Sequence, residues 1–369
     1  MSQLGGYGGY GGYGGYGGYG GYGGYGGSGA GPAAPTLADV FANPLVCAAL
    51  VANRDATIDP TDSARSRPEP QFGSPSNITR WEPWVRSHLL QWELCRGVTV
   101  GNSTSGGALE LIADGQRIAR LARPPTNFFM DQIGLVLCWS ELRSERTPEI
   151  LAQIDNQFAF VASITGLNPE RHPLTIELLV NAIQFTVLVE MQFKHALACW
   201  RPHQYSAQVQ PMVTTPGHGS FPSGHSTQAF MLARVLEGLL AATPKFASAR
   251  LQLYRQAARI ATNRVVAGLH FPADGIAGRL LGYSIAEYVL ARLGIDARQV
   301  FPRDFHATGI DGTTLDLDLT QPIDVPGLFA PAGYTIGAPV TIDAATTAGP
   351  SVLAELYTLG AAERAALTL

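Results

Sequence analysis

The stretch "PLTIELLVNAIQFTVLVEMQFKHALACW", residues 173–200, decides the fold class. Its apolar residues recur at intervals of three and four, which is the period of an amphipathic helix and not of a strand. Asn181, Gln184 and Glu190 interrupt the apolar run, which leaves it short of the ~20 clean apolar residues that a membrane span requires. We therefore predict a long core helix in a mainly helical protein, and no membrane span.

The same helical periodicity recurs along the rest of the chain. The further predicted helices are 81–95, 127–145, 148–166, Ser226–Ala242, Pro244–Val266, Asp274–Leu293 and a last amphipathic one, Val352–Leu367. Thr147-Pro148 and Thr243-Pro244 predict helix starts, because each places a capping hydroxyl before a proline in the first turn. Period-2 alternation is scarce before residue 310, and residues 303–349 predict short strands or an irregular wrap. The expected fold is all-α, an antiparallel helical bundle with irregular or short-strand decoration toward the C-terminus.

Composition narrows the classes of ligand. The 369 residues are 46% hydrophobic and 15% charged, so a sizeable core is expected, and the net charge of −4 argues against nucleic acid or an anionic membrane bound through overall charge. Any anion site must be a local cluster of cations. Four cysteines lie far apart without a CxxC motif, which suggests neither a zinc site nor a redox pair. Their apolar neighbours predict buried free thiols at Cys47, Cys95, Cys138 and Cys199.

A first chemical cluster lies in "KHALACWRP", residues 194–202. Lys194 and Arg201 are seven residues apart, so on one helix both would project from one face, and Pro202 would end that helix. Two cations on one face usually form a solvated surface. Here the neighbours are Ala, Leu, Cys and Trp, which predict burial, and buried cations without an acidic partner need an anion.

The second cluster is "GHGSFPSGHSTQ", residues 217–228, which leads into a predicted helix. A helix N-terminus offers unpaired N–H groups and the positive end of a dipole to an oxyanion. Ser223 adds a hydroxyl, Gly224 allows close backbone approach, and His225 projects from the first turn. Taken alone, such a histidine is more often a capped surface residue.

The third cluster is "RVVAGLHFPAD", residues 264–274. Arg264 precedes His270 by six positions and Asp274 follows it by four. The Asp274 carboxylate could accept the proton of one imidazole nitrogen and leave the other free to attack or to coordinate. The three clusters together supply two arginines, a lysine, a helix N-terminus and two histidines, a set suited to a tetrahedral or trigonal oxyanion.

The order and spacing of these clusters resemble the superfamily of type 2 phosphatidic acid phosphatases, bacterial class A acid phosphatases and vanadium-dependent haloperoxidases. Its pattern of Lys-x6-Arg-Pro, Pro-Ser-Gly-His and Arg-x5-His-x3-Asp is present at Lys194/Arg201/Pro202, Pro222–His225 and Arg264/His270/Asp274. The motifs cover about residues 190–285, while residues 36–190 match nothing in the pattern. Asn263 departs from it, since the superfamily usually has serine before the arginine. The resemblance implies a helical bundle of the haloperoxidase/acid phosphatase type.

The resemblance implies one of two chemistries, because phosphate and vanadate are both tetrahedral and can both become five-coordinate. In a haloperoxidase, His270 is the single protein ligand of vanadium, Lys194 polarises bound peroxide and His225 is the acid and base. In a phosphatase, His270 is the nucleophile and His225 protonates the leaving oxygen. The residues that would hold the oxyanion in either case are Lys194, Arg201, Ser223, Gly224 and Arg264. The implied cofactor is vanadate, with phosphate as the substrate group in the alternative, and neither haem nor a nucleotide is expected.

His218 and Trp200 favour the haloperoxidase. A second histidine seven residues before the motif histidine resembles vanadium bromoperoxidases, as does a tryptophan against the arginine, and both are expected to support the site from outside the anion contacts. "GSFPSGH" and "HFPADGIAG" resemble phosphatases at least as much. Without membrane spans a lipid phosphatase is disfavoured, and without a signal peptide a periplasmic acid phosphatase. We expect a vanadate-dependent haloperoxidase that oxidises halide, bromide first, with hydrogen peroxide; the alternative is a vanadate-inhibitable acid phosphatase acting through a phosphohistidine.

The chain is predicted to have a tail and one domain. Residues 5–25 are seven tandem copies of Gly-Gly-Tyr, so residues 1–35 are expected to be a disordered tail and residues 36–369 one mainly helical catalytic domain with its motif-bearing core at about 172–295. A third hypothesis makes the tail the functional part of an adhesive protein. Deleting residues 1–35 separates the two, because an enzyme keeps its activity and an adhesive loses its function.

Location and partners follow from the same observations. The N-terminus lacks a basic-then-apolar signal peptide, so a cytoplasmic location is the default expectation, with export by another route left open. The expected partners are small molecules, either peroxide and halide or a phosphate ester, and no nucleic acid. Resemblance to the superfamily favours a homodimer.

Overall fold

The computed structural model describes residues 44–58, 69–104, 106–154, 157–241, 246–318, 332–342 and 351–367. The Gly-Gly-Tyr repeats and Thr243-Pro244 lie outside the described residues. The helices are α2 (Pro44–Thr57), α3 (Pro83–Arg96), α4 (Thr126–Asp131), α5 (Ile133–Trp139), α6 (Arg143–Ala152), α7 (Phe158–Thr165), α8 (Pro173–Leu197), α9 (Pro202–Tyr205), α10 (Gly224–Leu240), α11 (Phe246–Val266), α12 (Pro272–Arg292), α13 (Val352–Leu359) and α14 (Ala361–Ala365). Short 3₁₀ turns lie at Pro75–Arg80, Ser140–Leu142, Ala207–Val209 and Asp296–Arg298.

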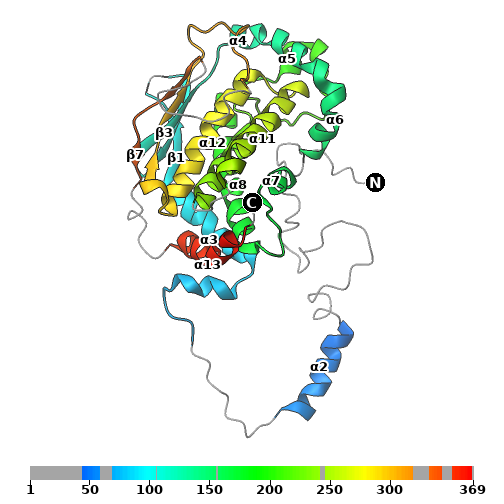
Figure 1. The fold of residues 1–369 in the computed structure, drawn as a ribbon, viewed down its shortest axis with the longest axis vertical. Coiled ribbons are helices and arrows are strands. Elements are labelled where there is room, and N and C mark those ends of the chain that lie inside the picture. The colour runs from blue at the N-terminus through cyan, green and yellow to red at the C-terminus, as the bar shows by residue number, and fades with distance from the viewer. Residues whose placement is uncertain are drawn as a thin grey trace.

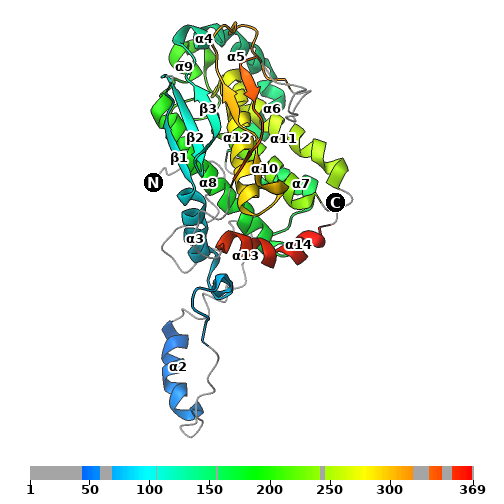
Figure 2. The ribbon, with the colours of Figure 1, turned by 90° about the vertical axis from the view of Figure 1, so that its left-hand side faces the viewer.

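Helix α12 lies at the centre of the fold, and every one of its residues is buried. It packs most extensively against α10, which in turn contacts α11 and α8, while its other side meets the sheet. Figures 1 and 2 show these four helices bundled together with the strands covering one face. A helix that is enclosed all round loses the one-sided apolar pattern of a surface helix. The prediction of a mainly helical bundle is confirmed.

Helix α8 is the core helix predicted from residues 173–200, but it ends earlier than expected. Ala198 has a left-handed φ of 48° and closes the helix after Leu197, so Arg201 lies beyond it as the N-cap of α9. The expectation that Lys194 and Arg201 share one helix face is therefore wrong. By length and composition, the segment Pro173–Tyr205 is the one candidate membrane span in the described part of the chain, and 67% of its most apolar window is buried inside the fold.

Two sheets decorate the bundle. Strands β1 (Val98–Asn102), β2 (Ala108–Ala113), β3 (Gln116–Ala122), β5 (Arg303–Phe305) and β6 (Tyr334–Ile336) form one sheet, and β4 (Gln299–Val300) pairs with β7 (Val340–Thr341). Neighbours in the larger sheet, in the order β1-β2-β3-β5-β6, are antiparallel except for the parallel pair β3 and β5. Of the two alternatives for residues 303–349, short strands are present, and β1, β2 and β3 lie before residue 310 although period-2 alternation is scarce there.

The sequence contains a local signal for the hairpin of β2 and β3, which hydrophobic periodicity did not predict. Asp114 and Gly115 connect β2 to β3, and both have positive φ, 46° and 79°. A two-residue turn of type I′ needs positive φ at both positions, and Asp-Gly is a preferred pair for it. This dipeptide between two apolar runs could have predicted the hairpin.

Several predicted helices are broken or shifted. Residues 127–145 form α4, α5 and the start of α6 in place of one helix, and 148–166 spans the end of α6 and α7. Thr147 is not an N-cap, because α6 already begins at Arg143 and contains Pro148; the Thr147 hydroxyl donates to the Arg143 carbonyl at 2.6 Å. At the C-terminus, Gly360 divides the last predicted helix into α13 and α14.

The cysteines correct another expectation. Cys47 and Cys138 are exposed and Cys95 is half-buried, so the prediction of buried thiols holds for Cys199 alone. Cys47 and Cys138 lie on helices whose apolar residues are not all enclosed, which residue type by itself does not reveal.

Helices α10 and α12 approach closely through two glycines of α12. A Cβ on Gly278 would lie 2.6 Å from the Ser223 carbonyl oxygen, and one on Gly282 would clash with the Thr227 carbonyl oxygen. The close approach carries Ser223, at the start of α10, against the helix that bears Asp274.

We expect Gly282→Ala to destabilise the fold by about 1–3 kcal/mol, because overpacking would push α10 from α12. Differential scanning calorimetry should show a melting temperature lower by several degrees. Gly134→Ala is the matched control, since an added Cβ on this α5 glycine meets nothing within 4 Å. Equal melting temperatures for the Gly282→Ala and Gly134→Ala proteins would contradict the packing argument.

Candidate active site

Lys194, in the last turn of α8, holds the loop that leads into α10. Its side chain is 1% exposed, and Nζ donates to the carbonyls of Gly219 and Ser220, both at 3.2 Å, and of Pro222 at 2.5 Å. Burial and the neighbouring Arg201 lower the Lys194 pKa to about 8. The expected buried cation is present, and backbone carbonyls satisfy its donors. It would therefore act on an anion mainly through its charge.

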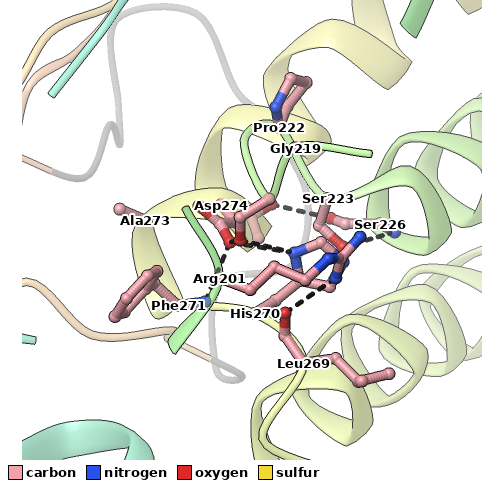
Figure 3. A network of polar contacts seen from close by, with 12 residues as sticks. Arg201, Gly219, Pro222, Ser223, Ser226, Leu269, His270, Phe271, Ala273 and Asp274 are labelled. Carbon is pink, nitrogen blue, oxygen red and sulfur yellow. Dashed lines mark hydrogen bonds and ion pairs between the residues drawn. The ribbon is translucent and has the colours of Figure 1, made fainter. Parts of the chain in front are cut away.

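Arg201 joins the first cluster to the other two. Its Nε donates to the His218 carbonyl at 3.2 Å and its Nη1 to the Leu269 carbonyl at 3.0 Å. Nη1 also lies 3.4 Å from His270 Nε2 (Figure 3). The side chain is buried, which lowers the Arg201 pKa to about 10, so the guanidinium stays charged at neutral pH. Although Arg201 lies outside α8, its guanidinium contacts the predicted site histidine.

Ser223 and Gly224 form the predicted helix start. Ser223 is the N-cap of α10 and Gly224 its first residue, and the Ser223 hydroxyl accepts from the Ser226 N–H at 3.5 Å. The first N–H groups of a helix have no carbonyl one turn earlier, so those of Gly224 and His225 can face an anion. The Ser223 N–H donates to the Asp274 carbonyl at 2.9 Å, which fixes this helix start against the third cluster.

His270 and Asp274 form the predicted pair. Asp274 Oδ2 accepts from His270 Nδ1 at 2.9 Å and from the Phe271 N–H at 3.0 Å (Figure 3). It also accepts from the Ser220 hydroxyl. An ionised carboxylate only accepts, so the His270 proton lies on Nδ1 and the Nε2 lone pair faces Arg201. Burial raises the Asp274 pKa to about 6, and burial with the adjacent Arg201 and Lys194 keeps the His270 pKa well below its usual value. His270 is thus a neutral ring with Nε2 available to bind or attack.

His225 has the opposite tautomer. Its Nε2 lies 3.0 Å from the carbonyl oxygen of Gln153, which can only accept, so Nε2 carries the proton and Nδ1 is the available base. Burial, and secondly the charge of Arg264, lower the His225 pKa to about 3. His225 is therefore uncharged at neutral pH and able to take a proton at Nδ1.

Arg264 approaches from α11 with its Nη2 edge anchored. Nη2 donates to the Ile150 carbonyl at 3.1 Å and to Gln153 Oε1 at 3.2 Å, whereas the buried Nε has no hydrogen-bond partner among the described residues. Burial lowers its pKa to about 10, which leaves it charged at neutral pH. Asn263, the departure from the superfamily pattern, donates to the same Gln153 oxygen at 2.9 Å. Arg264 is thus anchored here through Gln153.

His218 and Trp200 differ from each other in their placement. His218 is half-buried, with Nδ1 3.3 Å from Arg201 Nη2 and 3.2 Å from the Gly219 carbonyl, and burial lowers its pKa to about 4. Trp200 is 58% exposed and packs edge-on against Tyr205, with ring centroids 5.6 Å apart. The expected packing of Trp200 against the arginine is therefore not what the contacts show, because the chain turns between residues 198 and 202.

The three clusters converge on His270. After burial, the charges of Arg201 and Lys194 lower its pKa, and the charges of Arg264, Lys194 and Arg201 lower that of His225. The three cations and the N-terminus of α10 are thus grouped with the two histidines, His225 and His270, and the Asp274 carboxylate lies behind the His270 ring. Such a set of donors suits a multiply charged oxyanion. In the part of the chain that the structure describes, no group of three or more His, Cys, Asp or Glu could hold a metal cation directly.

Three residues of the site escaped the sequence motifs. Ser220 contacts Asp274, Gln153 contacts His225 and Arg264, and Glu190 lies on α8 one turn before Lys194. Ser220 lies inside the second cluster, where the sequence shows it without indicating a partner. Gln153 has no signal in the motifs. Glu190 does have a signal in the sequence, because glutamate is rarely buried in an apolar core helix unless its carboxylate has a partner.

Glu190 places a second carboxyl beneath the helix start. It is fully buried, its Oε1 accepts from Gln228 Nε2 at 3.1 Å, and a Cβ on Gly224 would lie 2.7 Å from the same oxygen. Burial raises its pKa to about 7, against the opposing effects of Lys194 and Gln228. Its charge therefore changes in the neutral range, close to the end of α10 that an anion would approach.

We expect oxyanion affinity to respond to this group. The folded pKa is raised from 4.5, so Glu190 is protonated well below pH 7 and adds a negative charge as pH rises through about 7. Glu190→Gln should bind phosphate like the parent at pH 5.5 and severalfold more tightly than the parent at pH 7.5, where the parent's Glu190 is mostly ionised and Lys194 is still mostly charged. Isothermal titration calorimetry of both proteins at both values tests this. A ratio of affinities that does not change with pH would contradict it.

Comparison with known proteins supports the same grouping. Residues 175–294 match the PAP2 superfamily, a span that contains all three clusters and nearly all of α8 to α12. The resemblance drawn from the motifs is confirmed over that segment. Members of this superfamily are typically phosphatases or haloperoxidases, and the match supports an activity of that general type. No curated protein matches the chain.

Proposed function

We propose that the protein is a vanadate-dependent haloperoxidase that oxidises halide, bromide first, with hydrogen peroxide. The observation that carries the proposal is the tautomer of His225, whose Nε2 donates to the Gln153 carbonyl at 3.0 Å and whose Nδ1 is therefore free of a proton in the neutral ring. Hydrogen peroxide must lose a proton as it binds, so a neutral base suits the peroxidase. A phosphatase needs the same histidine protonated before the leaving oxygen departs.

The donors fit vanadate. His270 Nε2 would be the single nitrogen ligand, and Arg201, Arg264, the Ser223 hydroxyl and the first N–H groups of α10 would hold the oxygens. The buried Arg264 Nε, unpartnered in the described residues, supports an oxygen acceptor at this point. Vanadate bound here would activate hydrogen peroxide toward attack by halide.

Each side chain then has a defined task. His225 takes a proton from peroxide at Nδ1 and returns it to the oxygen that leaves as water. Lys194, Arg201 and Arg264 offset the anionic charge, while Asp274 and Ser220 keep the His270 proton on Nδ1. The overall reaction is balanced, because hydrogen peroxide, bromide and one proton give hypobromous acid and water.

An acid phosphatase is the second candidate, and the free Nε2 of His270 favours it as much as the first. This nitrogen would attack phosphorus, the bond to the ester oxygen would break, and protonated His225 would supply the proton to the alcohol. A multiply charged phosphate ester beside His225 would raise the pKa of that histidine, since an adjacent negative charge favours the charged ring.

One paired assay separates the two. Metal-free protein is tested for peroxide-dependent bromination of a phenol and for hydrolysis of p-nitrophenyl phosphate, each with and without added vanadate. The proposal expects bromination that depends on vanadate and little hydrolysis. Hydrolysis that vanadate inhibits, with no bromination, would replace the first candidate by the second.

A further inference from the structure

Gln153 connects the end of α6 to two residues of the anion site. It lies outside the segment that matches the PAP2 superfamily, directly after Ala152, and its side chain is fully buried. Its N–H completes the helix by donating to the Glu149 carbonyl at 2.9 Å. The Gln153 carbonyl follows the last residue of α6, and it accepts a hydrogen bond from His225 Nε2.

The Gln153 amide has a defined orientation. Its oxygen accepts from Arg264 Nη2 at 3.2 Å and from Asn263 Nδ2 at 2.9 Å. A guanidinium has only donors, so the atom that faces Arg264 must be Oε1 and not Nε2. The buried Nε2 has no hydrogen-bond partner in the described parts of the chain.

The amides of Gln153 and Asn263 separate Arg264 from a nearby ion-pair network. Asn263 Oδ1 accepts from Arg146 at 3.1 Å, and its Nδ2 also donates to Glu149 Oε2 at 3.0 Å. Glu149 in turn pairs with Arg259 at 2.5 Å, and that hydrogen bond lowers the Glu149 pKa. The acidic group is therefore held by other cations, while Arg264 is held by a neutral oxygen.

We infer that Gln153 is a positioning residue for the oxyanion: its amide oxygen fixes the Nη2 edge of Arg264 without neutralising the guanidinium, so that Nε and the full charge stay available. Asn263 takes part by donating to the same oxygen, which accounts for the amide at this position. The inference rests on the proposed oxyanion site, and holds for either of the two chemistries.

The test compares two substitutions of nearly constant size. Gln153→Glu keeps the oxygen but adds a charge that pairs with Arg264, and Gln153→Met removes the acceptor. We expect phosphate affinity at pH 8 to fall about 10- to 100-fold in Gln153→Glu, and severalfold in Gln153→Met. In Gln153→Glu the loss should shrink as pH falls toward 5 and the new carboxyl protonates.

Gln91→Glu and Gln91→Met are the matched controls. Gln91 lies half-buried on α3, and its amide donates to the Asn181 carbonyl at 2.8 Å and not to a residue of the anion site. If Gln153 had a purely structural role, its two variants and the two control variants would all melt at lower temperature. Phosphate affinity and its pH dependence would then be the same in both pairs of variants. Calorimetric titration with phosphate and with vanadate gives the affinities.

The outcomes are distinguishable. If the parent binds the two ions and Gln153→Glu binds them equally well at pH 8, the inference about Gln153 is overturned. If the parent binds neither ion, the proposed oxyanion site itself fails.

Discussion

His270→Ala should fold and lose activity by on the order of 10⁴-fold or more, under either proposed chemistry. The side chain supplies a nitrogen whose lone pair faces the Arg201 guanidinium, 3.4 Å from Nη1. Without it, neither a ligand to vanadium nor a nucleophile for phosphorus remains at that point. Steady-state bromination and hydrolysis rates, with circular dichroism melting to confirm folding, give the measurement.

His195→Ala is the control for that variant, because His195 follows Lys194 directly but is exposed. Its activity should equal that of the parent. Asp274→Asn should lower the rate by about 10²- to 10⁴-fold, since an amide group can donate to His270 Nδ1 and so favour the wrong tautomer. Full activity of His270→Ala in both assays would remove this histidine from the mechanism.

His225→Ala should cost about 10²- to 10⁴-fold in turnover, the range for loss of a general acid or base. Affinity for vanadate should change less, because the oxygens are held by other groups. His218→Ala should preserve vanadate affinity and reduce bromination more modestly, since His218 meets the site through Arg201 at 3.3 Å.

Titration with vanadate and initial rates on both variants separate binding from turnover. If the His225→Ala and His218→Ala variants lost vanadate affinity equally, both histidines would contact the anion. If His218→Ala altered phosphatase turnover alone, in a parent with no bromination, the phosphatase would be the better account.

Local patterns predicted the parts of this protein that depend on short stretches of chain. The central helices follow from apolar periodicity, and the contact of His270 with Asp274 follows from a spacing of four residues at a helix start. The three clusters could be predicted to meet because buried lysine, arginine and histidine side chains need polar or charged partners.

What local patterns could not predict are contacts between distant segments. Gln153 meets Arg264 across 111 positions, and nothing near either residue indicates the other. The left-handed turn at Ala198 has no glycine to signal it, so Arg201 was expected on the preceding helix. Exposure of Cys47 and Cys138 likewise depends on what packs over a helix and not on its composition.

The central claim is that three distant segments build one oxyanion site, and the most direct measurement is thermal melting of the metal-free protein with vanadate and with phosphate. An ion at a hundred times its dissociation constant stabilises the folded state by about 2.7 kcal/mol, which raises the melting temperature by several degrees. We predict that rise in the parent and its loss in Arg201→Ala and Arg264→Ala. Unchanged melting of the parent at millimolar concentrations of both ions would contradict the account.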